Sequence, residues 1–267
     1  MNTLKQKANE ARKKILTMVH KAGTSHIASN FSVIDIATVL YSTLKPEDRV
    51  VWSAGWKAAT IYYFLAQRGE IPMEDLERFA KEEDGKIEYL GLAETNVPGV
   101  LVNGGSVGHG LPVAVGHALA KKRLGLPGMV YCICSDGEMN EGTVWESAAS
   151  AAHHKLDNLR VIVDANGWQA MGKTSEVLSM DVEYDTTLVD KFHSFGWKGI
   201  KINGHDHDLL ERFLTGVFPK GAPEKPFVII ADTIKGKGVS FMENHLLYHY
   251  KHVTDEDYQK AMAELSV

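Results

Sequence analysis

The stretch that decides the fold is SDGEMNEGTVWESAASAAHHKLDNLRVIVDANG, residues 135–167, together with the apolar run MVYCIC that precedes it. The run MVYCIC has the length of a strand, and LRVIVD at residues 159–164 is a second apolar strand. Between them, residues 140–154 have the pattern of a helix. A strand, a helix and a second strand in this order predict two parallel strands joined by a helical crossover.

Polar residues stand at the carboxyl ends of both predicted strands. Asp136 ends the first strand and Asn166 ends the second, thirty residues later. Because ligands bind at this edge of a parallel sheet, we expect the two side-chain oxygens to converge. A carboxylate, an amide oxygen and a backbone carbonyl suit a hard divalent cation. Gly137 lets the backbone approach a phosphate closely, and a helix amino end favours its negative charge.

The rest of the chain continues the alternation of strands and helices. This alternation predicts one α/β domain over residues 1–267, with a doubly wound, mostly parallel sheet and helices on both faces. We expect Gly23 to end the first helix and Ser32 to be the N-cap of the second. His205 or Asp206 is expected near the cap of the helix at 204–218, and residues 168–185 are expected to be loop-like. The expected further strands are 49–53, 197–202 and 226–234, and the expected helices are 3–22, 32–43, 57–68, 73–81, 111–124, 188–195, 204–218 and a last one after Thr254.

The composition indicates an ordinary globular protein. The chain has 267 residues, 44% hydrophobic and 24% charged, with a formal net charge of -5. This mild charge gives no indication of nucleic-acid binding, and no apolar stretch reaches the roughly 18 residues of a membrane span. Cys132 and Cys134 stand two apart in one strand, so they point to the same face and we expect no disulfide between them. Buried free cysteines favour a reducing cytoplasm.

Several blocks of the chain resemble transketolase. Proteins that use thiamine diphosphate carry Gly-Asp-Gly and, about thirty residues later, a turn that contains Asn; here these are Ser135-Asp136-Gly137 and Ala165-Asn166-Gly167. The resemblance covers nearly the whole chain but only the amino-terminal third of a full-length transketolase, the domain that holds the cofactor's diphosphate. It rests on DGEMNEGTVWESAASAAHHKLDNLRVIVDANGWQAMG, SVGHGLPVAVGHALA, IIADTIKGKGVSFME and, more weakly, AGTSHIASNFSVIDIATVLY.

The resemblance implies a set of cofactor ligands. Asp136, Asn166 and the carbonyl of Trp168 are expected to bind Mg²⁺ or Ca²⁺. Gly137 is expected to hydrogen-bond the diphosphate of thiamine diphosphate, and the adjacent Glu138 to belong to the same cofactor site.

The resemblance also implies residues around the rest of the cofactor. His26 matches a histidine near the diphosphate and the reacting carbon, and His249 matches one that contacts a substrate oxygen. Gly105 and Val107 lie where backbone groups meet the aminopyrimidine, and Lys235 matches a basic residue near the entrance. Two-carbon transfer needs acids near neutral pH, for which histidine is suited.

Two acidic residues match positions at a subunit interface. Glu141 and Glu146 correspond to residues that help to connect two active sites through a proton network. The resemblance therefore gives them a catalytic role that depends on a second subunit.

Two positions depart from the transketolase pattern. Trp56, in SAGWK, stands where the family has a histidine, and Leu92 stands where the family has another. Both missing histidines contact the cofactor or the first hydroxyls of the sugar. We therefore expect a specialised ketol transfer with a non-standard ketose or aldose phosphate, a sulfosugar, or an acceptor such as a carrier-protein thiol.

The resemblance also implies a partner. In this family the carboxylate that activates the aminopyrimidine lies on the following domain, and the chain ends at Val267 before any such domain. We expect a separate carboxy-terminal subunit with the pyrimidine-binding domain, in an α₂β₂ assembly. Two alternatives stay open: an α-subunit of a 2-oxo-acid dehydrogenase-like decarboxylase, which uses the same motif and the same split arrangement, and a non-catalytic scaffold subunit.

Overall fold

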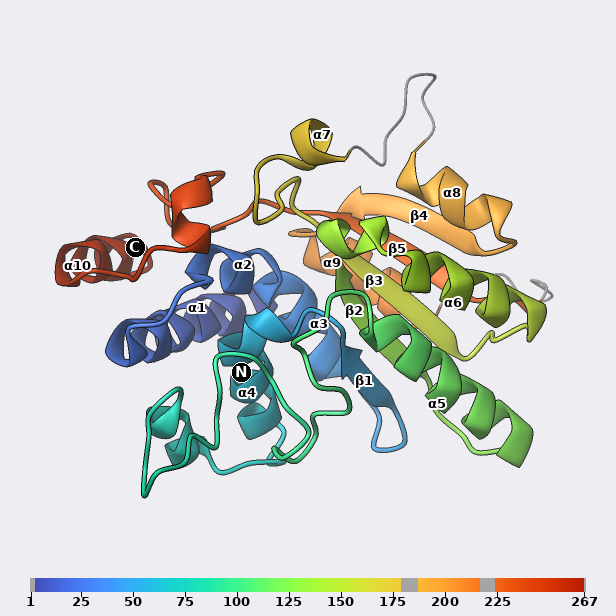
Figure 1. The fold of residues 1–267 in the computed structure, drawn as a ribbon, viewed down its shortest axis with the longest axis horizontal. Helices are drawn as coiled ribbons and strands as arrows, with labels where there is room; N and C mark the ends of the chain where they lie inside the picture. Colours follow the sequence, from blue (N-terminus) through green and yellow to red (C-terminus); the bar gives the residue numbers. More distant parts are fainter. Residues whose placement is uncertain (1–2, 179–186, 217–223, 267) are drawn as a thin grey trace.

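The computed structural model describes residues 3–178, 187–216 and 224–266, and their strands form one parallel sheet (Figure 1). The strand order is β1-β2-β3-β5-β4, and every pair of neighbours is parallel. This confirms the parallel pair predicted from MVYCIC and LRVIVD. The strands are β1 (Arg49–Trp52), β2 (Val130–Ser135), β3 (Leu159–Ala165), β4 (Lys198–Asn203) and β5 (Phe227–Asp232).

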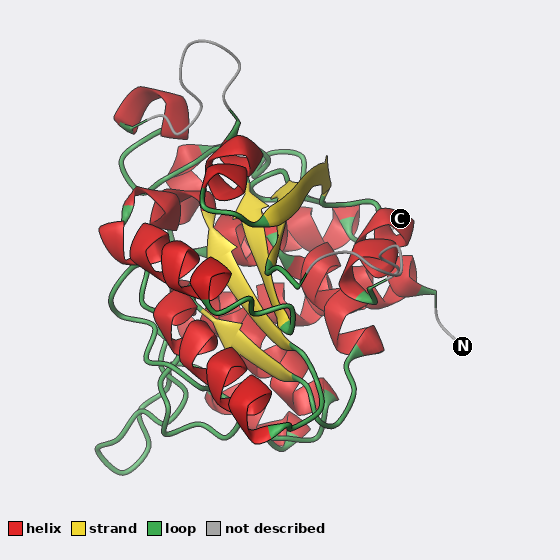
Figure 2. Ribbon diagram, turned by 90° about the vertical axis from the view of Figure 1, so that its right-hand side faces the viewer, coloured by secondary structure: helices red, strands yellow, loops and turns green. Residues whose placement is uncertain are grey.

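Helices cover both faces of this sheet, as the alternating pattern predicted (Figure 2). Successive strand residues point to opposite faces, so Val51 and Cys132 belong to one buried cluster and Val50 and Ile133 to the other. The first face is covered by α5 (Gly110–Leu124), α6 (Gly142–His153) and α8 (Leu188–Ser194). The second is covered by α2 (Ile27–Ser32), α3 (Ile34–Thr43), α4 (Ala58–Gln67) and α9 (His207–Leu214). Helix α1 (Leu4–Ala22) packs on α3 and α4, and α10 (Asp255–Glu264) packs on α1 (Figure 1).

The second predicted helix begins earlier than expected. The chain forms α2 directly after the turn at residues 24–26, and Ser32 ends α2 where the sequence pattern placed an N-cap. The prediction was wrong because Ser32 is fully buried and its hydroxyl donates to Asp164, a partner that is distant in the sequence. Gly23 ends α1 in the left-handed conformation, and Asp206 caps α9, both as predicted.

Short 3₁₀ segments replace parts of other predicted helices. The helix expected from residue 140 is the 3₁₀ turn η3 (Asp136–Asn140) followed by α6, and the segment expected at 73–81 is η2 (Met73–Arg78). The others are η1 (Gly55–Lys57) and η4 (Leu246–His249). The predicted loop after Gly167 contains the single helical turn α7 (Thr174–Val177). Residues 179–185 of this loop lie outside the described residues, as do residues 217–218 of the predicted helix at 204–218.

A close backbone contact brings the glycine-rich turn onto the end of β1. A Cβ atom at Gly55 would overlap the Cα of Gly104, so neither position has room for a side chain. The amide of Gly110 donates to the hydroxyl of Ser53 over 3.0 Å, which fixes the amino end of α5 against the same strand. The turn that carries Gly105 therefore lies beside Trp56.

The two cysteines on β2 and the helices of the described residues were also the subject of sequence predictions. The sulfur atoms of Cys132 and Cys134 lie 3.6 Å apart and are not bonded, as predicted. None of the helices within the described ranges has the length and apolar character that a membrane span requires.

Candidate active site

A cavity of 330 Å³ lies at the carboxyl ends of the central strands. Most of the residues that the sequence predicted for a cofactor site line it, although they come from loops that are far apart in the chain. Trp56 and Leu92, the two departures from the transketolase pattern, line it as well. The predicted residues in its wall are His26, Gly105, Val107, Gly137, Glu141, Asn166, Trp168, Lys235 and His249.

Asp136 is a buried carboxylate behind this wall. Its oxygens accept hydrogen bonds from the backbone amides of Gly137, at 2.9 Å, and Gly167, at 2.6 Å, so the ends of the two strands do meet. Burial, and then the charge of Asp164, raise the pKa of Asp136 to about 7. Within the described residues Asp136 has no ion-pair partner, and a buried carboxylate is costly unless a cation compensates its charge.

The donor atoms around Asp136 are oxygens of the kind that a hard cation prefers. Asn166 is 7% exposed and its Oδ1 accepts from the amide of Trp168 over 3.2 Å, which folds residues 166–168 into a tight turn. No group of three His, Cys, Asp or Glu side chains gathers as a metal site in the described part of the chain. A cation at Asp136 would therefore depend on amide and carbonyl oxygens, which fit Mg²⁺ or Ca²⁺ and do not suit a soft metal.

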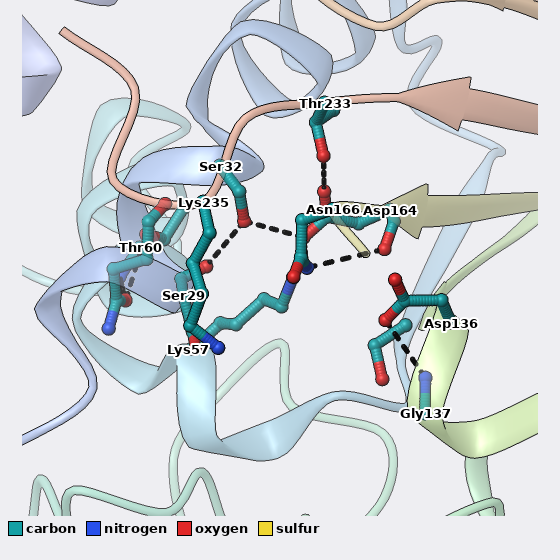
Figure 3. Close-up of polar contacts among 12 residues, drawn as sticks. Ser29, Ser32, Lys57, Thr60, Asp136, Gly137, Asp164, Asn166, Thr233 and Lys235 are labelled. Atoms are coloured by element: carbon teal, nitrogen blue, oxygen red, sulfur yellow. Dashed lines mark hydrogen bonds and ion pairs between the residues drawn. The ribbon is translucent and has the colours of Figure 1, made fainter. Parts of the chain in front are cut away.

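Asp164 is a residue near the site that was not predicted from the sequence. It lies on β3 with no exposed side-chain surface, and it accepts hydrogen bonds from Ser32, Lys57 and Thr233 (Figure 3). These donors come from α2, from η1 and from the residue after β5. Burial alone would raise the pKa of Asp164, but the charge and hydrogen bond of Lys57 lower it below its ordinary value. The available signal was a carboxylate inside the apolar run LRVIVD, which must have a partner when it is buried.

Lys235 and His249 form a second pair in the cavity wall. The ammonium of Lys235 donates to Nδ1 of His249 over 2.8 Å, and both side chains are buried. Burial first, and then the charge of Lys235, lower the pKa of His249 to about 3, while burial lowers the pKa of Lys235 to about 8. The neutral ring of His249 then carries its proton on Nε2, and the buried ammonium favours an anion in the cavity.

His26 lies beside His249 in a strained conformation. Its φ of 69° is in the left-handed region, its amide donates to the carbonyl of His249 over 3.1 Å, and the two rings make an edge contact. The hydroxyl of Ser25 lies 2.8 Å from its Nδ1. Burial, followed by the charge of Lys235, lowers the pKa of His26. Residues held in such backbone conformations concentrate at functional sites, so the strain supports a role for His26 in the cavity.

Glu138 lies beneath the cavity and does not line it. Its side chain is fully buried and accepts hydrogen bonds from Ser53, from the amide of Ser135 at 2.7 Å and from the amide of Gly108 at 3.1 Å. Burial raises the pKa of Glu138. Glu138 therefore connects the ends of β1 and β2 to the glycine-rich turn through hydrogen bonds, behind the residues that line the cavity.

Glu141 and Glu146 are both exposed. Glu141 lies at the start of α6 and reaches the cavity, whereas Glu146 lies on the outer surface of α6. Val107, 38% exposed, and Leu92, 42% exposed, flank the mouth of the cavity from the loops before α5. The opening is thus surrounded by accessible acidic and apolar side chains.

The comparison with protein families matches nearly all of the chain. Residues 3–266 match the family described as "Transketolase, thiamine diphosphate binding domain". Among the solved structures, transketolase from Campylobacter jejuni is similar with a TM-score of 0.88 and 29% sequence identity. The superposition covers 100% of this chain but 43% of that transketolase, so the chain spans less than half of it.

Two curated relatives have about the same length as this chain. One is a subunit of the apulose-4-phosphate transketolase of Phocaeicola vulgatus; it is 34% identical, with 100% of this chain and 95% of the relative covered. The other is the 6-deoxy-6-sulfo-D-fructose transketolase subunit SqwG of a Clostridium species; it is also 34% identical, with 98% of this chain and 96% of the relative covered. Both relatives are thus named as subunits.

Proposed function

Because this chain belongs to the transketolase family as a thiamine diphosphate-binding domain, we propose that it is the diphosphate-binding subunit of a ketol-transferring enzyme. The observation that carries the proposal is the cavity lined by Asn166, Lys235 and His249, with the carboxylate of Asp136 held behind its wall by the amide of Gly167. The enzyme transfers a two-carbon ketol unit and needs a partner subunit for activity. We also propose that residues 1–267 form one domain.

The wall of the cavity and the carboxylate behind it have the groups to hold the cofactor. Asp136, Asn166 and the carbonyl of Trp168 would bind Mg²⁺ or Ca²⁺, while Gly137 and Lys235 would face the diphosphate. The exposed backbone of Gly105 and Val107 would meet the aminopyrimidine, and Glu138 would support that turn through Gly108. When bound, thiamine diphosphate supplies the electron sink for the transferred carbon unit.

The two histidines act on the substrate in this proposal. The Nε2–H of His249 donates a hydrogen bond to a substrate oxygen, because Lys235 occupies the other ring nitrogen. His26 holds its ring beside His249 and contributes a second polar contact near the same oxygen. Both rings are neutral near pH 7, so they polarise oxygen atoms as neutral groups before any proton moves.

A separate carboxy-terminal subunit completes the site in this proposal. Two relatives of matching length are named as subunits of transketolases, which supports a two-subunit enzyme here as well. The partner would supply the pyrimidine-binding domain and the carboxylate that activates the aminopyrimidine. Glu141 and Glu146 are exposed where a second chain could contact them, and we propose an α₂β₂ assembly. The unbonded pair Cys132 and Cys134 supports a reducing, cytoplasmic location.

Trp56 and Leu92 would decide the substrate. Both line the cavity, and both replace polar histidines with side chains that cannot donate to a sugar hydroxyl in the same way. The relatives named for apulose-4-phosphate and 6-deoxy-6-sulfo-D-fructose support a donor outside the pentose phosphates. We propose a non-standard ketose phosphate or related sugar as donor, with an aldose phosphate or a carrier-protein thiol as acceptor.

The test is ketol transfer by the chain together with its partner. The chain is co-purified with the protein encoded beside it and assayed with thiamine diphosphate, Mg²⁺ and a panel of ketose phosphates, a sulfo-ketose and pyruvate. Transfer from a ketose that requires both proteins is expected. Decarboxylation of pyruvate without ketose use would favour the 2-oxo-acid dehydrogenase alternative, and transfer by the isolated chain would refute the need for a partner.

A further inference from the structure

We infer that Asp164, with its charge balanced by Lys57, is a positioning residue that turns the amide oxygen of Asn166 toward the cation. This inference rests on the proposed function, because it concerns the same cation site. It assigns roles to two buried residues that are not themselves ligands.

The first step is the saturation of Asp164. Its Oδ2 accepts from the hydroxyl of Ser32 at 2.6 Å, from the ammonium of Lys57 and from Nδ2 of Asn166 at 3.3 Å, and its Oδ1 accepts from Thr233 (Figure 3). Neither Asp164 nor Lys57 has more than 1% of its side chain exposed. With four donors on two oxygens, Asp164 has little capacity left to bind a metal ion, so its role is to orient a neighbour.

The second step is the orientation of the Asn166 amide. A carboxylate only accepts hydrogen bonds, so the NH₂ group of Asn166 must face Asp164, and the amide oxygen must face the opposite side. On that side Oδ1 accepts one hydrogen bond, from the amide of Trp168, and keeps a lone pair for a cation. A flipped amide would bring two oxygens together at Asp164. The carboxylate therefore fixes which atom of Asn166 faces the cation.

The third step is the charge of this part of the site. Asp164 and Asp136 are two buried carboxylates that contact the same turn, Asp164 through Nδ2 of Asn166 and Asp136 through the amide of Gly167. Lys57 compensates Asp164 directly, and Lys235 lines the same cavity. Because Lys57 neutralises Asp164, the buried charge that is left for the cation to compensate is that of Asp136.

Two double variants separate orientation from charge. Both contain Lys57→Met, and they differ at residue 164: Asp164→Asn keeps a carbonyl oxygen that can accept from Asn166, whereas Asp164→Leu has a similar shape but no acceptor. Replacing a buried ion pair by neutral groups of similar volume is often tolerated, so both should fold, and thermal unfolding checks this. Lys260→Met is the matched control, because Lys260 forms an exposed pair with Glu256 on α10.

The readout is Mg²⁺ affinity, measured on the full chain in excess thiamine diphosphate by the fluorescence of Trp56 and Trp168 in the cavity wall. The double variant with Asp164→Leu should bind Mg²⁺ ~10–100-fold more weakly than the wild type, which is the usual effect of removing a residue that orients a ligand. The double variant with Asp164→Asn should lose less than about threefold in Mg²⁺ affinity. Lys260→Met should bind Mg²⁺ with the affinity of the wild type.

Each outcome decides one claim. Equal Mg²⁺ affinities in the two double variants, at equal unfolding temperatures, would overturn the role of Asp164 and leave the proposed function intact. A wild-type chain that shows no Mg²⁺-dependent response, alone or with its partner, would overturn the proposed function and this inference with it.

Discussion

The ammonium of Lys235 donates to Nδ1 of His249 across 2.8 Å in the wall of the cavity. This hydrogen bond decides how His249 can act. With Nδ1 occupied by a cation, the ring is held neutral and presents its Nε2–H to the cavity. His249 is then a hydrogen-bond donor near pH 7 and is not a charged acid.

The pair predicts an altered titration of His249. Lys235→Met should raise the pKa of His249 from about 3 toward 6.5, because it removes the charge that opposes ring protonation, although burial continues to lower the pKa. A pH titration of His249 by NMR measures this. An unchanged titration of His249 would contradict the proposed tautomer.

The same pKa shift predicts how stability depends on pH. His249 has a lower pKa in the folded chain than in the unfolded chain, so the unfolded state binds more protons between about pH 3 and 6.5. The free energy of unfolding should therefore rise with pH across this window. In His249→Gln this contribution should be absent, and denaturant unfolding at pH 5 and 7 compares the two proteins. An equal change in the free energy of unfolding between pH 5 and pH 7 in the wild type and the variant would contradict the lowered pKa of His249.

Asp35 is predicted to be a major stabilising residue outside the cavity. It is 6% exposed and accepts from Arg12 at 2.5 Å, from His205 at 2.7 Å and from His207 at 2.8 Å. Asp35→Ala leaves a buried guanidinium without its partner, so it should lower the free energy of unfolding by ~3–5 kcal/mol. Urea unfolding measures the loss. The matched control is Glu77→Ala, whose exposed pairs with Lys14 and Lys21 should contribute much less. Equal losses in the two variants would rule out this role.

Trp56 and Leu92 are predicted to affect donor choice more than cofactor binding. Trp56→His and Leu92→His restore ring nitrogens that can bind sugar hydroxyls, so kcat/KM for an ordinary pentose phosphate should rise relative to the native donor by about tenfold or more. The thiamine diphosphate affinity should stay within about twofold, since neither side chain is among the expected ligands. Leu126→His, at an exposed position outside the cavity, is the control. A loss of cofactor affinity without a change in donor preference would contradict this role.

The sequence predicted the fold well because its strands are continuous apolar runs. The parallel sheet, the helices on both faces and the meeting of Asp136 with the turn at Gly167 all followed from MVYCIC, LRVIVD and the residues that end them. The family was also recognisable from the blocks around these strands. The roles of the individual site residues toward a cofactor stay predictions, although most of them line one cavity.

The errors came from contacts between distant parts of the chain. Serine is a residue type that favours N-caps, but Ser32 ends α2 because its hydroxyl donates a hydrogen bond to Asp164, more than a hundred residues away. Lys57 was predicted only as the start of a helix, and its burial against Asp164 has no local signal. The turn of η3 directs Glu138 behind the cavity, and its role toward a cofactor stays a prediction. Local pattern cannot give such pairings, since they depend on tertiary packing.

The metal-free chain offers one more prediction, at Asp136. Burial disfavours the charged form of Asp136 and raises its pKa to about 7, so Asp136→Asn should stabilise the metal-free chain at pH 8 by ~1 kcal/mol or more. Differential scanning calorimetry in EDTA measures the change. A destabilised variant would show that the carboxylate is satisfied without a cation.

The most direct test of the central claim is calorimetric titration of thiamine diphosphate into the chain with its partner, with and without Mg²⁺. Binding is expected with Mg²⁺ and should be lost with EDTA. It should also be lost in Asp136→Ala with Mg²⁺ present, because the carboxylate at the end of β2 is the charged ligand of the cation. Full affinity in Asp136→Ala, or no binding by the wild-type assembly, would contradict the account.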